Sequence, residues 1–355
     1  MTDPEWPSIF DGHNDMLLQL AELPAHEAIR QFLDGRGDGH LDWPRMRRGR
    51  FGGGLFAVFV PPANDRSPLV PTGTGYDKAL APAMGAAEAM PRVMTMISRL
   101  LRIEAASEGR FRICRSVADI RAAESVGAVA AVLHFEGAEA IDTDFEALDV
   151  FHAAGLRSLG LVWSRSSAFG EGVPFRFPSG PDTGPGLTEA GFALVAACNR
   201  RRIAIDLSHL NEQGFWDVAR TSDAPLIASH SNAHAICPHA RNLTDDQLRA
   251  IARSNGIVGL NFANYFLRPD GGLGADTSIE VMLDHLDHML SIMGPDHVGL
   301  GSDFDGVRAM PAPIRDVASL PALPQAMQAR GYDAATIAAI SRDNWLRVLE
   351  ATWGG

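Results

Sequence analysis

Short apolar segments recur along the whole chain, and most are continuous rather than alternating with polar residues. Eight of them are expected to form β-strands, over residues 8–10, 55–60, 128–135, 157–163, 203–207, 226–229, 257–262 and 298–300. Continuous apolar runs of this length are typical of parallel strands that are buried on both faces.

Amphipathic segments separate several of these predicted strands. We expect helices over residues 78–107 (with a break near Pro91), 187–201, 244–255, 279–293 and 333–351. The third helix carries its own boundary markers. Thr244 and Gln247 have the spacing of a capping box, and Gly256 follows the last turn.

The alternation of strands with helices indicates βαβ units, and eight such strands predict an α/β fold of the (β/α)8 TIM-barrel type. We expect one domain over residues 1–355, with long Gly- and Pro-rich loops near 61–76 and 170–186. A doubly wound sheet is the alternative. No Gly-x-Gly-x-x-Gly motif follows the first strand and no phosphate-binding loop motif occurs, which disfavours nucleotide-binding folds.

Composition and charge narrow the class of protein further. Of the 355 residues, 46% are apolar and 21% are charged, which is typical of a globular protein and excludes disordered, collagenous and disulfide-rich classes. The net charge of -12 disfavours a nucleic-acid partner. Three widely spaced cysteines, the absence of a bilayer-length apolar stretch and an N-terminus unlike a signal peptide predict a cytoplasmic protein without membrane contact.

Polar side chains cluster at the ends of five predicted strands. In a parallel barrel those ends meet at one face, which is where barrel enzymes place their active sites. The side chains expected to converge there are His13, Asp15, Glu136, His209, His230 and Asp303. Imidazoles together with carboxylates are ligands that zinc prefers, so the sequence predicts a divalent metal site.

Other histidines are expected to serve the structure. His134 lies within an apolar run and is expected in the core. His285 and His288 have a spacing that suits chelation, but a solvated helix face is the favoured interpretation. His234 and His239 flank a Cys-Pro pair and are expected to have a role in a loop.

Short motifs follow one another in a characteristic order along the chain. They are Asp11-Gly-His-Asn-Asp15, Glu136-Gly137, Asp206-Leu-Ser-His209, Ser229-His-Ser-Asn232, Arg241-Asn242, Asp245-Asp246, Gly301-Ser-Asp-Phe-Asp-Gly306 and Asn344-Trp-Leu-Arg-Val348. With these motifs the chain resembles the renal-type membrane dipeptidases, metallopeptidases that cleave dipeptides at a two-zinc site. The resemblance covers nearly the whole chain, and the order of the motifs makes it specific.

The resemblance implies a role for each residue that matches the family's metal site. His13 and Asp15 are expected to hold one zinc ion. His209 and His230 are expected to hold a second, and Glu136 is expected to bridge the two.

The resemblance also implies the reaction and the residues that assist it. Asp303 is expected to take a proton from the attacking water and to deliver it to the leaving amine. Arg241 is expected to pair with the terminal carboxylate of the substrate, and a surface arginine is the alternative. The implied reaction is hydrolysis of dipeptides, including those that end in a D-residue, by a metal-bridging hydroxide. A homodimer is the implied assembly.

Two positions depart from the family's pattern. Trp163 stands where the family has a histidine that contacts the substrate carbonyl, and an indole cannot become a cation. Trp163 is expected to fill volume in the substrate pocket, and Arg165 is a candidate for stabilising the oxyanion. Ala263 stands where some members have a substrate-binding tyrosine, with Tyr265 nearby but out of register.

These departures leave two other hypotheses open. One is a different amide hydrolase on the same metal-dependent barrel, such as an N-acyl amino acid deacylase. The other is a barrel that binds a metal or ligand without catalysis, although every expected ligand type is present in this sequence.

Overall fold

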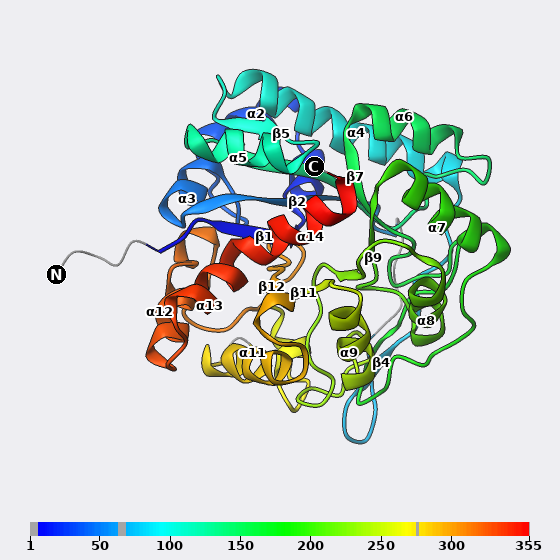
Figure 1. Ribbon diagram of the computed structural model, residues 1–355. Coiled ribbons are helices and arrows are strands. Elements are labelled where there is room, and N and C mark those ends of the chain that lie inside the picture. The colour runs from blue at the N-terminus through cyan, green and yellow to red at the C-terminus, as the bar shows by residue number, and fades with distance from the viewer. Residues whose placement is uncertain (1–5, 63–68, 275–276, 355) are drawn as a thin grey trace.

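Eight parallel strands close into a barrel that is surrounded by helices (Figure 1). The computed structural model describes residues 6–62, 69–274 and 277–354. The barrel strands are β1 (Ile9–Asn14), β2 (Phe51–Phe59), β6 (Val129–Glu136), β7 (Leu156–Gly160), β9 (Ala204–Asp206), β10 (Ile227–Ala228), β11 (Ile257–Leu260) and β12 (Val298–Leu300). The barrel closes because β2 pairs with both β1 and β6. The predicted TIM-type barrel is therefore confirmed.

Helices connect the barrel strands and cover their outer faces (Figure 1). They are α1 (Met16–Ala21), α2 (Ala25–Asp34), α3 (Trp43–Arg48), α4 (Ala86–Ala106), α5 (Val117–Ser125), α6 (Glu146–Ala154), α7 (Glu189–Arg201), α8 (Glu212–Thr221), α9 (Asp245–Arg253), α10 (Asn264–Leu267), α11 (Glu280–Met293), α12 (Ala322–Ala329), α13 (Ala334–Ala338) and α14 (Asn344–Trp353). The capping box predicted at the start of α9 is present, because Thr244 and Gln247 each accept a hydrogen bond from the other's backbone N–H.

The predicted start of the helix over residues 78–107 is wrong. It begins at Ala86 and continues without a break through Pro91, which lies in the second turn and removes only one intrahelical hydrogen bond. Residues 76–78 instead form β4 (Tyr76–Lys78), which pairs with β3 (Val70–Pro71) and β8 (Phe175–Phe177).

Both predicted long loops therefore contribute to a small antiparallel sheet at the carboxyl side of the barrel. Part of the first loop, residues 63–68, lies outside the described residues. Pairing between segments that are about a hundred residues apart depends on tertiary contacts, which a local hydrophobic pattern does not reveal.

Two other elements differ from the prediction. β5 (Phe111–Ile113) was missed, and it pairs with the first residues of β6 alongside the barrel. The helix predicted over residues 333–351 is divided into α13 and α14 by a π-helical turn, Ala339–Asp343. A strand of three residues is too short to show a periodic pattern of its own.

The C-terminal helix α14 crosses the middle of the ring of helices and packs on the amino end of the barrel (Figure 1). Trp345 is fully buried there, 6.3 Å from Phe10 between ring centroids, and its Nε1 donates to Leu300 O at 2.9 Å. Gly12 leaves the space for this indole, because a Cβ at that position would collide with it. Apolar side chains thus fill the interior of the barrel at its amino end.

The barrel strands come from residues 9–300, and the segments that follow pack against them. The single domain expected over residues 1–355 stays a prediction. Among the described residues, no helix is both long and apolar enough to cross a membrane.

Candidate metal centre

The six side chains predicted to converge do lie together, buried at the carboxyl ends of the barrel strands. Together with Asp206, these side chains form three overlapping groups whose potential ligand atoms lie within 4.8 Å of one another: His13, Asp15 and Asp303; Glu136, His209 and His230; and His13, Asp206 and His230. Asp206 was not predicted as a site residue. In the sequence it stands only as the first residue of the Asp206-Leu-Ser-His209 motif.

Glu136 lies at the centre of this cluster. Its Oε1 is 2.8 Å from Nε2 of His209 and 3.5 Å from Nε2 of His230. On the other side, the same oxygen is 3.7 Å from Nε2 of His13, which in turn lies 3.5 Å from Asp15 Oδ2. One carboxylate oxygen therefore faces imidazoles from three strands, the arrangement expected of a ligand shared by two ions.

Neighbouring hydroxyls orient two of these imidazoles. Ser164 Oγ lies 3.0 Å from Nδ1 of His209, and Ser229 Oγ lies 2.7 Å from Nδ1 of His230. Both rings therefore turn Nε2 towards Glu136, as histidine ligands do when their second nitrogen is held. Burial, followed by nearby cations, lowers the pKa of both imidazoles well below the usual histidine value, which favours the neutral form that binds metals.

The other half of the cluster contains polar atoms that lack partners. Within the described residues, Nδ1 and Nε2 of His13 and Oδ1 of Asp15 are buried and make no hydrogen bond. Each such atom is unfavourable by about 1–3 kcal/mol unless a ligand satisfies it. Imidazole nitrogens beside carboxylate oxygens are a donor set that suits zinc, so the residues present fit a divalent metal centre.

Asp303 is held beside this half of the cluster in an unusual backbone conformation, with φ of 61°. Its Oδ2 accepts a hydrogen bond from Asn261 Nδ2 at 2.8 Å. Burial raises the pKa of Asp303 to about 6, an effect that His13 opposes and Asp15 reinforces. Gly306 is required alongside, because a Cβ there would collide with the carboxylates of Asp15 and Asp303.

Arg241 is buried on the opposite side of the cluster. Only 2% of it is exposed, so the alternative of a surface arginine is wrong. Its guanidinium donates to Ser208 O and, at 3.2 Å, to His230 O. His239 accepts a hydrogen bond from the Arg241 backbone N–H at 3.0 Å, which gives that histidine the loop role predicted for it.

A cavity of about 80 Å³ lies over the cluster. Its polar lining includes Asp15, Glu136, His209, Arg241 and Asp303, and its aromatic lining is Phe59, Trp163, Phe175, Tyr265 and Phe266. Tyr265 reaches the cavity because it lies on the short helix α10, which begins after Ala263. Phe175 was not predicted as a site residue. It lies in the loop predicted over residues 170–186, and the length of that loop was the feature of the sequence that could have indicated a role in the site.

Trp163 forms part of the aromatic wall, as expected for a residue that fills pocket volume. Its ring lies 4.8 Å from Phe59 and 5.9 Å from His209 between centroids. Asn261, which donates to Asp303, was not predicted as a site residue, although it lies within the predicted strand 257–262.

Arg165 lies behind Trp163 rather than in the cavity, with its guanidinium 5.1 Å from the centre of the indole. It donates to Val60 O at 2.6 Å and lies 3.3 Å from Glu139, with both side chains buried. The hypothesis that Arg165 stabilises an oxyanion is therefore wrong. A buried cation is stable only with local partners, and those partners turn it away from the substrate.

The remaining histidines serve the fold. His134 is buried and its Nδ1 lies 2.9 Å from Ser158 Oγ, which confirms the expected core position. The solvated helix face predicted for His285 is wrong, because this side chain is fully buried and bonds the backbone at Ala233 N and Leu267 O. Burial of the polar His285 ring is tolerated because both of its nitrogens form hydrogen bonds with backbone groups.

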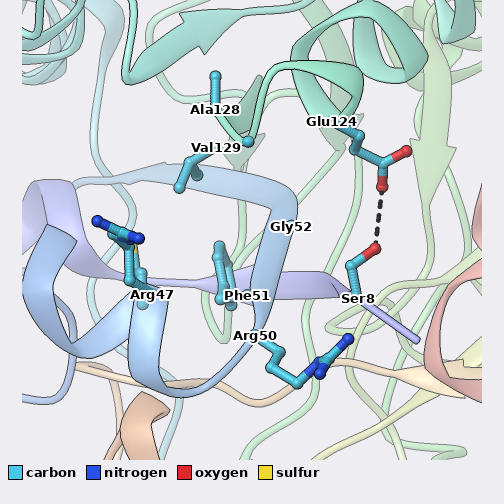
Figure 2. Close-up of a pocket in the computed structure, with 10 residues that line it drawn as sticks. Ser8, Arg47, Arg50, Phe51, Gly52, Glu124, Ala128 and Val129 are labelled. Carbon is cyan, nitrogen blue, oxygen red and sulfur yellow. Dashed lines mark hydrogen bonds between the residues drawn. The ribbon is translucent and has the colours of Figure 1, made fainter. Parts of the chain in front are cut away.

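A larger hollow lies at the amino end of the barrel. It has a volume of about 330 Å³, and Figure 2 shows Arg47, Arg50 and Glu124 around it, with Ser8 donating to Glu124 at 3.3 Å. None of the three groups of metal-type ligands found among the described residues lies in its lining. The smaller cavity is therefore the better candidate for the functional site.

Comparison with known proteins gives consistent matches. The profile of the membrane dipeptidase family (peptidase family M19) matches residues 5–353. The structure of dipeptidase AC, a family M19 metallopeptidase, superposes with a TM-score of 0.94 at 52% identity and covers 99% of this chain and 100% of that chain.

Two further relatives extend this comparison. A metallopeptidase from Rhodobacter sphaeroides, liganded with a phosphinate mimic of the dipeptide L-Ala-D-Ala, has a TM-score of 0.94 at 51% identity, covering 98% of this chain and 100% of that chain. An uncharacterized protein from the pqqA 5′ region of Klebsiella pneumoniae is 48% identical over 254 residues, which are 72% of this chain and 93% of that protein.

Proposed function

The chain belongs to the membrane dipeptidase family, peptidase family M19, and from that premise we propose that it cleaves dipeptides with two zinc ions per chain. As a member of this family it is a metallo-dipeptidase, a hydrolase of peptide bonds. The observation that carries the two-metal proposal is the position of Glu136 Oε1, within 3.7 Å of three imidazoles.

We assign the ligands as the resemblance to the family implies. His13 and Asp15 would hold one ion, and His209 and His230 the other. Glu136 would bridge them, since its Oε1 faces both halves. When bound, the ions lower the pKa of a water molecule and polarise the substrate carbonyl.

Asp303 would move the proton. Its carboxylate borders the cavity, and the hydrogen bond from Asn261 fixes its orientation. A carboxylate held in this way can accept a proton from the attacking water and deliver it to the leaving amine.

Arg241 would bind the terminal carboxylate of the dipeptide. Arg241 lines the cavity, and its guanidinium donates to the backbone carbonyls of Ser208 and His230 and lies 5.3 Å from the centre of the Phe266 ring. A planar donor that is already desolvated and oriented suits a bidentate contact with a carboxylate. Trp163 and its aromatic neighbours would exclude water from the reaction.

We include dipeptides that end in a D-residue among the substrates. The Rhodobacter sphaeroides relative was solved with a mimic of L-Ala-D-Ala, which supports this assignment. A panel of L-Xaa–D-Xaa and L-Xaa–L-Xaa dipeptides, beside N-acyl amino acids, would test it on the purified protein with metal content measured by elemental mass spectrometry.

We expect about two zinc ions per chain and dipeptide turnover that chelation abolishes and zinc restores. Two ions with turnover of N-acyl amino acids alone would favour the deacylase hypothesis. A protein that binds no metal and gains no activity when metal is added would contradict the proposal. The homodimer and the cytoplasmic location stay predictions.

A further inference from the structure

A second, wider cavity adjoins the catalytic one. Its volume is about 370 Å³, against about 80 Å³ for the cavity over the metal cluster. The two cavities share three aromatic residues in their linings: Trp163, Phe175 and Tyr265. The two cavities therefore adjoin along these three rings.

The outer cavity is lined mainly by apolar and aromatic side chains. Beyond the shared residues, its wall includes Leu69, Tyr76 and Leu273. Leu69 is 39% exposed and Leu273 is 51% exposed, so two large apolar side chains face solvent at the same place. Lys78 and Arg308 bring positive charge to its lining. Apolar surface gathered beside a catalytic cavity is typical of a site for an apolar group.

The volumes restrict what each cavity can hold. An apolar cavity that accommodates a benzene ring measures about 150 Å³. The inner cavity, at about 80 Å³, is too small for such a ring. The outer cavity, at about 370 Å³, is the one of the two with room for a large side chain.

Aromatic contacts indicate which end of the dipeptide faces the outer cavity. Arg241 lies 5.3 Å from the centre of the Phe266 ring. Phe266 stacks on Phe175 at 6.1 Å and 11° and lies 4.4 Å from Tyr265. The wall shared by the two cavities is thus one ring away from the guanidinium that would bind the substrate carboxylate. The residue that carries this carboxylate is the C-terminal one.

We propose that the outer cavity binds the side chain of the C-terminal residue and selects large apolar side chains at that position. This inference rests on the proposed dipeptidase function and narrows its substrate class. The residues that would make this selection, chiefly Leu273 and Tyr76, lie outside the metal cluster.

A substrate series tests the proposal on the zinc-loaded enzyme. The series is L-Ala–D-Ala, L-Ala–D-Phe, L-Ala–D-Asp and L-Phe–D-Ala, with the matching L,L compounds. We expect kcat/KM for L-Ala–D-Phe to exceed that for L-Ala–D-Ala by about tenfold or more, since burying even one methylene in an apolar pocket changes selectivity by about tenfold.

The outcomes separate this proposal from the one on which it rests. No cleavage of any dipeptide would contradict the dipeptidase function itself. Cleavage of L-Ala–D-Ala without a gain for either configuration of C-terminal phenylalanine would overturn only the outer-cavity proposal. A preference for C-terminal aspartate would instead assign the cavity to acidic side chains through Lys78 and Arg308, and a gain only for L-Phe–D-Ala would assign it to the N-terminal residue. Both results would overturn the proposal.

A variant pair gives an independent test. Leu273→Glu places a carboxylate in the outer cavity at an exposed position, so the fold should tolerate it. We expect the ratio of kcat/KM for the phenylalanine substrate to that for the alanine substrate to fall about tenfold. Leu101→Glu is the matched control, since Leu101 is 41% exposed on α4 and lines neither cavity. An equal ratio in both variants would contradict the proposal.

Discussion

The two ends of the barrel hold charged groups in opposite environments. At the amino end, Glu124 is partly exposed and accepts a hydrogen bond from Ser8 (Figure 2). It also accepts from Arg342, so its charge is satisfied within the fold. At the carboxyl end, Glu136 and its neighbours are buried, and His13 and Asp15 retain atoms without partners among the described residues. The hollow at the amino end is about four times larger than the cavity over the metal cluster, and the outer cavity beside that cluster is of similar size to the hollow.

This difference shows that a cluster of buried ligand-type side chains with unsatisfied polar atoms, rather than cavity size, distinguishes the functional end. Burying a polar atom without a hydrogen bond is unfavourable, so such a cluster indicates a place where a bound ligand supplies the missing interactions. At the amino end, apolar packing and paired charges stabilise the barrel. At the carboxyl end, the buried polar side chains favour ligand binding at the expense of the stability of the fold.

Substitution of Glu136 provides the strongest test of this comparison. We expect Glu136→Gln to lower kcat/KM by about 10⁴-fold, because loss of the shared carboxylate removes several kcal/mol of metal-based stabilisation. Metal content should fall in elemental mass spectrometry. The metal-free variant should melt no lower than metal-free wild type, since burial raises the pKa of the Glu136 carboxyl well above its ordinary value and so favours a neutral group at this position. A lower melting temperature would assign Glu136 a structural role.

Substitution of Asp303 separates proton transfer from metal binding. Asp303→Asn should lower kcat by about 10³-fold, within the range for loss of a general acid–base group. The zinc content should stay at the wild-type value, because the ligand set assigned above does not include Asp303. An unchanged rate would show that Asp303 does not carry the proton, and the Asn261→Asp303 hydrogen bond would then serve only the loop.

Gly306 tests how closely the carboxylates must be placed. In Gly306→Ala the new Cβ would displace Asp15 and Asp303, and a shift of about 1 Å at a catalytic group lowers activity by about 10²-fold. Gly180→Ala is the control, since nothing lies within 4 Å of a Cβ built there. Equal kcat/KM for the two variants would mean that the site accommodates the added methyl group.

The smallest effect is expected at the amino end. Glu124→Gln weakens the pair with Arg342, whose side chains are 14% and 24% exposed, and should lower the free energy of unfolding by about 1 kcal/mol. Urea unfolding would measure this change, and kcat/KM should match wild type. A loss of activity in this variant would contradict the separation of roles between the two ends.

Much of the fold could be predicted from local pattern. All eight barrel strands were predicted, because parallel strands that are buried on both faces have continuous apolar sequences. The convergence of His13, Glu136 and Asp303 followed from their place after such runs, since parallel strand ends share one face. β5 and the β3–β4–β8 sheet were missed because such short strands depend on pairing partners.

Individual side chains in the site were harder to predict. The direction of Arg165 depends on Val60 and Glu139, which come from other strands. The burial of His285 depends on backbone groups at Ala233 and Leu267. Neither set of partners is adjacent in sequence, so residue type and spacing could not reveal them.

By itself, the sequence determined the barrel, the order of its strands and the set of ligand-type residues at their ends, because these depend on local hydrophobicity and on chain order. Only the tertiary structure decided that Glu136 faces three imidazoles, that Arg241 is buried beside them and that two cavities share one aromatic wall. The physical reason is that distances, burial and the satisfaction of polar atoms arise from contacts between segments far apart in the chain.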